Sequence, residues 1–260
     1  MRTYSIVNRK GGVGKTTTAI ELAYILATSC KQRVLLVDAD SQGDATAVLR
    51  KGTLSDGLTA VLEGTEPYYE NLICRTDVDW LDLLPAGDGL AKLDMDCLLG
   101  EVKPRFYALR DFLEVLAEDD VYDAVVIDCP PYYSLSCLNA IAACSGVIIP
   151  TGTDAYSAVG MEGLVEQIDD IRRVCPEVKV LGALVTRWHK AAVVEDAEAY
   201  LRESAPVPVF KTVIRRTDKV EEASWARQAT QQWSPFSAAS RDYRAFVTEL
   251  LRMEGVKVGE

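Results

Sequence analysis

The chain alternates between short runs of apolar residues and longer segments in which apolar residues recur every three or four positions. Continuous runs are typical of strands buried in a parallel sheet, and the longer spacing is typical of amphipathic helices. The predicted strands are residues 3–7, 33–37, 80–84, 124–127, 146–150 and 178–186, and the predicted helices are 19–26, 58–62, 106–116, 158–174, a segment from about 191, and 236–253. This order predicts an α/β fold, a doubly wound, mostly parallel sheet with helices on both faces.

The last helical segment carries a regular apolar stripe with the i, i+3, i+4, i+7 and i+8 spacing of a face turned toward a core. Its members are Tyr243, Phe246, Val247, Leu250 and Leu251. A chain of 260 residues is long enough for one large domain and short for two. We therefore predict a single domain over residues 1–260.

A glycine-rich segment separates the first strand from the first helix. Gly11, Gly12 and Gly14 lie within four positions, and residues without a Cβ atom let backbone N–H groups converge on an anion. Lys15 adds a positive charge, Thr16 adds a hydroxyl suited to Mg²⁺, and the helix that follows adds its N-terminal dipole. We interpret the segment as a phosphate-binding loop. The predicted nucleotide contacts are Lys10, Gly11, Gly12, Val13, Gly14, Lys15, Thr16 and Thr17.

The loop departs from the ordinary pattern G-x-x-x-x-G-K-[ST] in one informative way. Arg9 stands where that pattern has its first glycine, and a second lysine, Lys10, precedes Lys15 by five residues. This arrangement resembles the deviant Walker A motif of the ParA/MinD family of P-loop ATPases. The resemblance implies a P-loop NTPase fold and the cofactors ATP and Mg²⁺. It also implies an ATP-bound homodimer in which Lys10 reaches the nucleotide of the other protomer.

Carboxylates follow two of the predicted strands, at the sheet edge where doubly wound folds bind ligands. Asp128 ends the run 124–127 in the manner of a Walker B motif and is a candidate Mg²⁺ residue acting through water. Asp38 and Asp40 begin a segment that resembles the family motif D-x-D-P-Q-G-N, with Ser41 and Asp44 in place of proline and asparagine. The resemblance implies that Asp40 orients the attacking water, with Asp38 supporting it. The predicted catalytic residues are then Lys10, Lys15 and Asp40, and the predicted metal residues are Thr16, Asp40 and Asp128.

A segment in the last third, residues 211–223, resembles the family pattern T-x-I-P-R followed by E-A, with Arg215 in the place of proline. The resemblance implies that Ile214, and with it Arg187, lies on the nucleotide side, and that the outer side contacts DNA. The sequence between residues 211 and 227 contains five basic and three acidic residues. The predicted DNA contacts are Arg215, Arg216 and Lys219, and a solvated face of mixed charge is the alternative.

The net charge of −11 argues against a nucleic-acid partner, but the charge is unevenly distributed. Residues 53–123 hold 17 acidic and 5 basic residues, so the rest of the chain is close to neutral and a basic face elsewhere is possible. The seven cysteines form no C-x-x-C pair, so we interpret them as reduced residues that pack in the core and hold no metal. No group of metal-ligating residues accompanies His189 in the sequence.

From this resemblance we predict a slow, ATP-dependent DNA-partitioning ATPase of plasmid or chromosome segregation. It would form an ATP-sandwich dimer, bind DNA non-specifically, and be released by hydrolysis that a ParB-like centromere-binding protein stimulates. Alternatives are a MinD-like positioning ATPase, a ligase on the same loop, and a protein akin to the nitrogenase iron protein with a cluster near Cys129, Cys137 and Cys144.

We expect a cytoplasmic protein that is nucleoid-associated when ATP is bound and has no membrane partner. No apolar run approaches the roughly 18 residues of a spanning helix. Residues 254–260, after the last helix, have too little apolar surface for a bilayer anchor.

Overall fold

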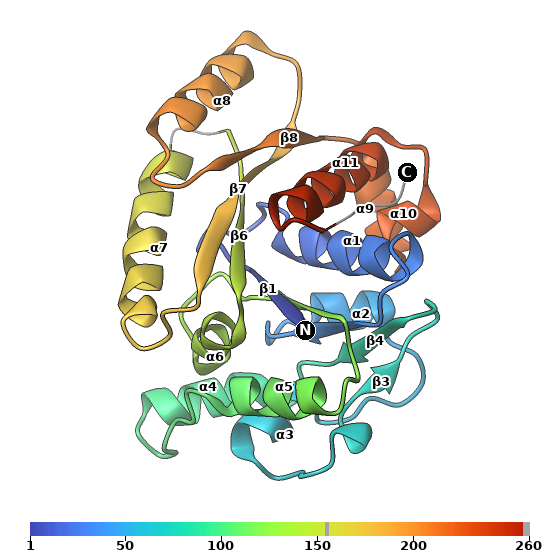
Figure 1. Cartoon of the computed structure of the whole chain (residues 1–260), viewed down its shortest axis with the longest axis vertical. Helices are drawn as coiled ribbons and strands as arrows, with labels where there is room; N and C mark the ends of the chain where they lie inside the picture. The colour runs from blue at the N-terminus through green and yellow to red at the C-terminus, as the bar shows by residue number, and fades with distance from the viewer. Residues whose placement is uncertain (154–155, 257–260) are drawn as a thin grey trace.

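The computed structural model describes residues 1–153 and 156–256, which form a central sheet between two layers of helices (Figure 1). The strands follow the spatial order β3-β4-β2-β5-β1-β6-β7-β8. The β3–β4 pair is antiparallel, and the other neighbouring strands are parallel. The strands are β1 Arg2–Ile6, β2 Val34–Asp38, β3 Cys74–Arg75, β4 Leu81–Leu84, β5 Ala124–Asp128, β6 Gly146–Thr151, β7 Lys179–Trp188 and β8 Val209–Arg215.

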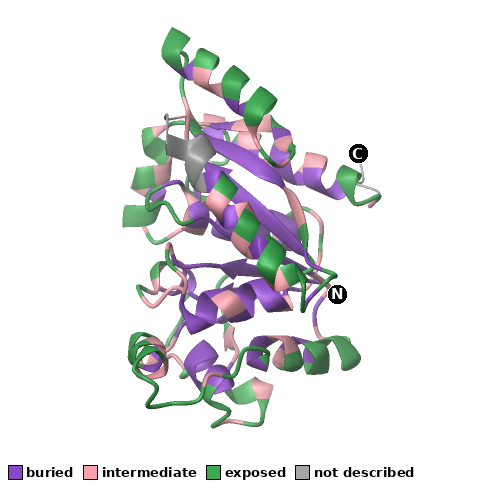
Figure 2. Ribbon diagram, turned by 90° about the vertical axis from the view of Figure 1, so that its left-hand side faces the viewer, coloured by how far each residue is buried: buried purple, intermediate pink, exposed green. Residues whose placement is uncertain are grey.

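Helices cover both faces of this sheet, and Figure 2 shows the buried strands between helices with exposed outer faces. One layer includes α1 and α11, and the other includes α3, α5, α6 and α7. The helices are α1 Lys15–Thr28, α2 Asp44–Leu49, α3 Gly57–Glu63, α4 Leu90–Leu98, α5 Ala108–Glu118, α6 Leu135–Ala143, α7 Tyr156–Arg172, α8 Ala192–Ser204, α9 Asp218–Trp225, α10 Thr230–Trp233 and α11 Ala238–Met253. A 3-10 turn spans Tyr69–Asn71.

Alternate residues of the central strands pack into two separate hydrophobic cores, one on each face of the sheet. In β2, Leu35 and Val37 pack with the layer of α3 and α5, whereas Val34 and Leu36 pack with the layer of α1 and α11. This two-sided burial follows from the period of two along a strand, and it explains why the strand reads as a continuous apolar run.

The predicted fold class is confirmed, and the predicted strands and helices lie within a few residues of the observed ones. The apolar stripe from Tyr243 to Leu251 is buried as expected. The edge strands β3 and β8 and the helices α2, α4, α6, α9 and α10 were not predicted individually. The single-domain assignment stays a prediction. Residues 257–260, in the segment after α11, lie outside the described residues. No described helix is long and apolar enough to cross a bilayer.

The carboxyl ends of β1, β2 and β5 meet at one place in the sheet. Ile6 pairs with Asp128, and Asp38 pairs with Asp128 from the other side. The glycine-rich loop leaves β1 directly after Ile6. The parallel register therefore brings the loop and both strand-end aspartates together, although Asp128 is more than a hundred residues from the loop in sequence.

Carboxylates of α11 and an arginine of α8 cap the backbone of the edge strand β8. The N–H groups of Lys211 and Thr212 donate to the Glu249 carboxylate at 2.7 and 2.9 Å. The Arg202 guanidinium donates to the carbonyl oxygens of Phe210 and Lys211 at 2.9 and 3.2 Å. These contacts occupy backbone groups with which another strand could pair.

Replacing Glu249 with alanine should destabilise the chain, because the substitution leaves two backbone N–H groups and the Thr212 hydroxyl without their charged acceptor. We expect a loss of about 2 kcal/mol in the free energy of unfolding, measured by urea titration. Glu203→Ala, an exposed carboxylate on α8, is the matched control and should change stability by less than about 0.5 kcal/mol. Equal stabilities of the two variants would contradict the capping role.

Candidate functional site

The loop between β1 and α1 takes a conformation that requires glycine at two positions. Gly12 has φ of 72° and Gly14 has φ of 80°, both in the left-handed region where a Cβ atom is unfavourable. A Cβ atom added at Gly11 would meet nothing within 4 Å. The loop therefore turns tightly and leaves open space beside its backbone.

The Asn8 side chain holds the start of the loop against the backbone of β6. The Asn8 side-chain amide donates to the carbonyl oxygen of Pro150 at 2.7 Å, and the Asn8 amide oxygen accepts from the N–H of Lys10 at 2.9 Å. Asn8 thus connects β6 to Lys10, the residue that the family resemblance predicts to reach across a dimer. The Lys10 side chain is exposed.

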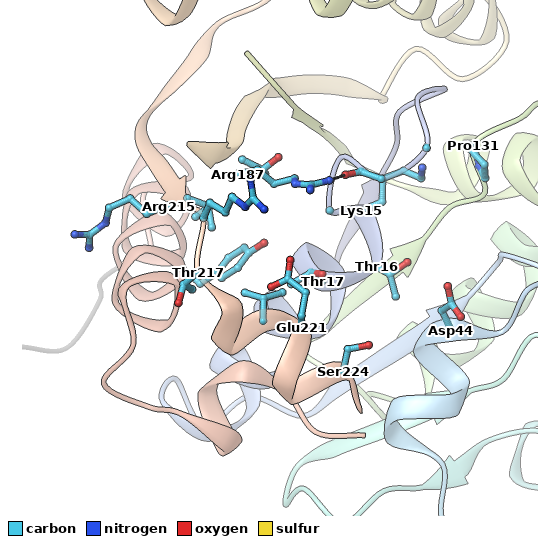
Figure 3. A pocket seen from close by; sticks show the side chains of 18 of the residues that line it. Lys15, Thr16, Thr17, Asp44, Pro131, Arg187, Arg215, Thr217, Glu221 and Ser224 are labelled. Atoms are coloured by element: carbon cyan, nitrogen blue, oxygen red, sulfur yellow. Dashed lines mark hydrogen bonds between the residues drawn. The ribbon is translucent and has the colours of Figure 1, made fainter. Parts of the chain in front are cut away.

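Two residues at the end of β7 hold the second half of the loop. The Thr186 hydroxyl donates to the carbonyl oxygen of Val13 at 2.8 Å, and the Arg187 guanidinium donates to that of Gly12 at 3.0 Å (Figure 3). Arg187 has φ of 56°, an uncommon conformation for a residue with a side chain. With these carbonyl groups directed toward β7, the loop backbone is fixed before any ligand binds.

Lys15 begins α1 and is 7% exposed, which is unusual for a lysine. Its Nζ donates to the carbonyl oxygen of Lys10 at 3.2 Å. Burial lowers the pKa of Lys15, and the charges of Asp128 and Asp40 oppose that change. The ammonium group is therefore held inside the loop, close to carboxylates.

The two aspartates at the strand ends are both buried but differ in their partners. Asp38 accepts hydrogen bonds from the N–H and the hydroxyl of Thr46, each at 2.7 Å, and from the N–H of Asp40 at 3.2 Å. Neither carboxylate oxygen of Asp128 has a hydrogen-bond partner among the described residues. Burial, followed by the charge of Asp38, raises the pKa of Asp128. A buried carboxylate without partners is costly and fits the presence of a cation or its bound water.

Asp40 differs from both of these residues because it is partly exposed and lines an open cleft. Its carboxylate accepts from the N–H of Gln42 at 3.0 Å, and its carbonyl oxygen accepts from the N–H of Gly43 at 2.9 Å. The side chain is thus positioned by its own turn and is accessible to a small molecule.

The cleft has a volume of about 500 Å³ and runs from the loop to α9. Figure 3 shows Arg187 on one side of it and Thr217, Glu221 and Ser224 on another. The predicted site residues that line it are Gly11, Gly12, Gly14, Lys15, Thr16, Thr17, Asp40, Arg187, Ile214, Arg215 and Arg216. Val13 and Asp128 are buried, and neither Lys10 nor Lys219 is among the lining residues.

Two of the three predicted DNA-contacting residues form ion pairs within the chain. The Arg215 guanidinium donates to both Asp242 carboxylate oxygens, at 2.9 and 2.6 Å, and its backbone N–H also donates to Asp242. Proline at this position could not make the backbone contact, so the departure from the family pattern is linked to Asp242. Lys219 pairs with Glu222 at 2.7 Å. Arg216 is exposed and forms no ion pair with any residue that the structure describes.

Glu21 is a site-adjacent residue that the sequence analysis did not identify. It lies on α1, is 1% exposed, and accepts hydrogen bonds from the backbone N–H groups of Thr230 and Gln231 at the start of α10. The signal in the sequence was a glutamate inside an otherwise apolar stretch of helix. The contact ties the helix that carries Lys15 to the segment that follows α9.

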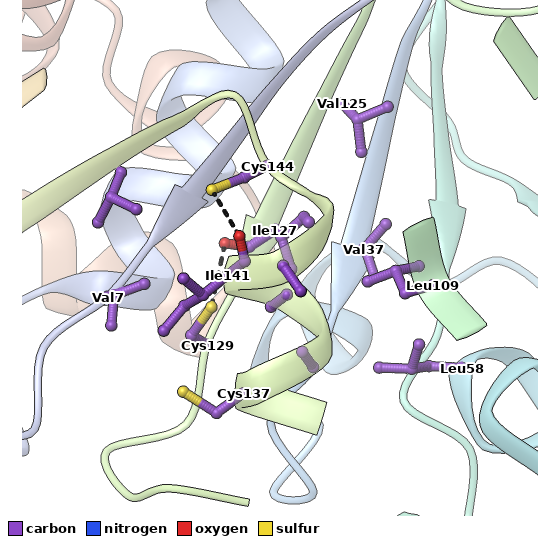
Figure 4. Close-up of a cluster of buried hydrophobic side chains, with 14 of the residues drawn as sticks. Val7, Val37, Leu58, Leu109, Val125, Ile127, Cys129, Cys137, Ile141 and Cys144 are labelled. Atoms are coloured by element: carbon purple, nitrogen blue, oxygen red, sulfur yellow. Dashed lines mark hydrogen bonds between the residues drawn. The ribbon is translucent and has the colours of Figure 1, made fainter. Parts of the chain in front are cut away.

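The cysteines close to this site lie in the core. Cys129, Cys137 and Cys144 are at most 2% exposed and pack near Val7 and Ile141 (Figure 4). Such burial does not place them where they could bridge two protomers, as the cluster interpretation would require. His189 is exposed.

Comparison with known proteins identifies related chains. Residues 1–180 match the family described as AAA domain. The chain is 38% identical over 254 residues to the chromosome-partitioning ATPase Soj of Thermus thermophilus, covering 96% of both chains. It is 32% identical over 266 residues to the chromosome partitioning protein ParA of Caulobacter vibrioides, covering 98% of this chain and 95% of that one.

A solved structure supports the same fold. Cobyrinic acid a,c-diamide synthase from Mycobacterium smegmatis, determined with bound ADP and magnesium, superposes with a TM-score of 0.82. The two sequences are 31% identical, and the superposition covers 98% of this chain and 95% of the synthase.

The buried carboxylate of Glu21 predicts a pH-dependent stability. Burial raises the pKa of Glu21 to about 7, whereas an unfolded glutamate titrates near about 4.3. Between these values the folded chain retains a proton that the unfolded chain has lost, so the stability that Glu21 contributes decreases as the pH rises.

Glu21→Gln cannot titrate, so we expect its stability relative to the natural chain to improve by about 2 kcal/mol from pH 5 to pH 8 in urea unfolding. Other buried carboxylates cancel in this difference. Glu203→Gln, at an exposed position, is the control and should show no trend with pH. A constant offset for Glu21→Gln across the range would refute the prediction.

Proposed function

The chain belongs to the AAA-domain family of Soj- and ParA-type ATPases, and on this basis we propose that it is an ATP-dependent DNA-partitioning ATPase of plasmid or chromosome segregation. The observation that carries the proposal is the convergence of a fixed glycine loop, a buried lysine and Asp40 at one cleft, next to the buried strand-end aspartates Asp38 and Asp128. This set of groups suits the binding and hydrolysis of a nucleoside triphosphate.

ATP and Mg²⁺ fit the groups around the cleft. The loop backbone, Lys15 and the N-terminus of α1 would bind the phosphates, and Thr16, Asp40 and Asp128 would hold Mg²⁺ directly or through water. The ion supplies positive charge that offsets the charge of the phosphates. The orphaned oxygens of Asp128 are the clearest support for this assignment, because they are buried and have no protein partner among the described residues.

In the proposed hydrolysis Asp40 orients the attacking water. The partial exposure of Asp40 beside the loop supports this role. Asp38, which accepts from the N–H groups of both Thr46 and Asp40, keeps the turn in place. Phosphoryl transfer depends mainly on positioning and electrostatics, so Lys10, Lys15 and Asp40 can contribute without a covalent intermediate.

We further propose that ATP closes two protomers face to face, with Lys10 of each contacting the phosphates held by the other. The exposed position of Lys10 on the fixed loop supports this step. The closed dimer then binds DNA non-specifically, and hydrolysis, slow alone and stimulated by a ParB-like centromere-binding protein, releases it. The protein would be cytoplasmic and associated with the nucleoid in its ATP-bound state.

DNA binding in this proposal centres on Arg216, with Arg215 and Lys219 beside it. Arg215 and Arg216 line the same cleft as the phosphate loop, which offers a route by which nucleotide occupancy affects DNA contact. Because Arg215 and Lys219 are paired with Asp242 and Glu222, Arg216 should provide the largest share of the charge that is accessible to phosphates.

An ATP-dependent synthase is the second candidate, favoured by the likeness to the Mycobacterium smegmatis enzyme. A MinD-like positioning ATPase, acting through a protein partner, is the third. The ATPase rate with and without non-specific duplex DNA separates the partition function from both. Stimulation by DNA supports partition, and a rate that is indifferent to DNA at low salt contradicts it.

Asp40→Ala should retain ATP binding and ATP-dependent dimers but hydrolyse ATP at less than about a hundredth of the natural rate, because the water loses its orienting carboxylate. The measurements are phosphate release and size-exclusion chromatography with Mg²⁺ and ATP. Asp88→Ala, an exposed aspartate that does not line the cleft, is the control. Hydrolysis at the natural rate would remove Asp40 from this role.

Arg216→Glu should weaken ATP-dependent binding to duplex DNA about tenfold at 0.1 M salt and make the affinity less sensitive to salt, because one phosphate contact is lost. Fluorescence anisotropy over a salt series measures both quantities, with dimer formation followed in parallel. Arg173→Glu places the same charge change at an exposed position away from the cleft. An equal effect of the two variants would indicate a general charge effect and refute the local contact.

A further inference from the structure

Three large aromatic side chains are exposed near the end of the chain. Trp225 is 90% exposed, Phe236 is 82% exposed and Trp233 is 46% exposed. We call these three residues the aromatic surface. Large exposed aromatic groups that lie together usually mark a binding site, because their burial on binding is favourable.

Contacts along α9 and α10 bring these residues to one region. The Trp233 indole N–H donates to the Glu222 carboxylate at 3.1 Å. Glu222 lies three residues before Trp225 on α9, so the two share a side of that helix. Phe236 follows Trp233 by three residues, in the short connection between α10 and α11, and Figure 1 shows α9, α10 and this connection adjoining one another.

Two arginines adjoin the aromatic surface at its Phe236 end. The Arg241 guanidinium donates to the carbonyl oxygen of Phe236, and the Arg244 guanidinium donates to that of Pro235 at 2.8 Å. Residues 223–241 contain no acidic residue, although the whole chain has a net charge of −11. The nearest carboxylates have partners, since Glu222 pairs with Lys219 and Asp242 pairs with Arg215.

We propose that the aromatic surface binds single-stranded nucleic acid. Free ring faces stack with unpaired bases, and Arg241 and Arg244 neutralise the adjoining phosphates. A duplex hides its base faces, so this surface prefers unpaired strands over the duplex expected to bind near Arg216. The choice of nucleic acid over another flat anionic partner rests on the proposed DNA-binding function.

Helix α9 connects this surface to the nucleotide cleft. Thr217, Glu221 and Ser224 line the cleft on one side of α9 and its cap, and Trp225 follows Ser224 directly. A residue of the cleft wall is thus directly bonded to a residue of the aromatic surface, and we expect nucleotide binding in the cleft to affect that surface. Binding of a single strand should accordingly be stronger with ATP than without nucleotide.

The test uses the full chain with Mg²⁺ and ATP and two labelled probes, a thirty-nucleotide deoxythymidine strand and a duplex of the same length. The double variant Trp225→Ala, Phe236→Ala should bind the single strand at least about tenfold more weakly, because each stacked base contributes about 1–3 kcal/mol. Duplex binding should change less than about twofold. Tyr200→Ala, an exposed aromatic residue on α8, is the matched control and should bind both probes normally.

A second readout keeps the test independent of folding. Addition of the deoxythymidine strand should quench the tryptophan fluorescence of the natural chain, and Trp225→Phe, which keeps a stacking ring, should restore most of the affinity that alanine loses. Unchanged single-strand affinity of the double variant overturns the proposal. If that variant, with unaltered single-strand affinity, instead loses dimer formation or binding to phosphatidylglycerol vesicles, the aromatic surface is a dimer interface or a membrane-binding surface, and the proposal is overturned.

The same two probes distinguish a failure of the proposed partition function from a failure of the aromatic surface. A natural chain that binds the single strand but not the duplex supports the aromatic surface and contradicts non-specific duplex partition. A natural chain that binds the duplex with an affinity independent of Trp225 and Phe236, and binds the single strand no better than the variant does, contradicts the aromatic surface alone.

Discussion

The burial of charged groups at the carboxyl end of the sheet is the constraint on which the rest of the structure depends. Lys15, Asp38 and Asp128 are each at most 7% exposed, so water solvates them little. Burying such groups is costly unless they compensate one another or bind a ligand. Asp38 is compensated by Thr46, and Lys15 lies near the carboxylates, whereas Asp128 depends on a cation or its water. The arrangement is thus stable and still requires a charged ligand to become complete.

Rigidity around these charges comes from contacts made far away in the sequence. The loop is fastened to β6 through Asn8 and to β7 through Thr186 and Arg187, so its carbonyl groups face protein and its N–H groups can converge on an anion. Glu21 connects the helix behind the loop to the segment that follows α9, and α9 itself forms another wall of the same cleft. The loop and the helix behind it are thus joined to distant parts of the chain by a few defined hydrogen bonds.

The sequence predicted the parts of this site that depend on local chemistry. Glycines at positions 12 and 14 are required by their left-handed conformation, and the continuous strands are required by burial on both faces, so both were recognisable without a structure. The partner of Arg215 was not recognisable from the sequence. Spacing along the chain places Lys219 one helical turn from Glu222, but only tertiary packing brings Asp242 of α11 to Arg215. Glu21 was missed for the same reason, because its acceptor role depends on a turn about two hundred residues later.

The capped backbone of β8 also limits how copies of this chain can assemble. At one margin of the sheet Glu249 and Arg202 occupy backbone groups of β8, and at the other margin β3 is a strand of only two residues. Neither margin offers a long row of unpaired groups for a strand of a neighbouring molecule. Growth by joining sheets edge to edge is thereby disfavoured. Any association between copies is therefore left to surfaces where side chains, and not strand backbones, meet.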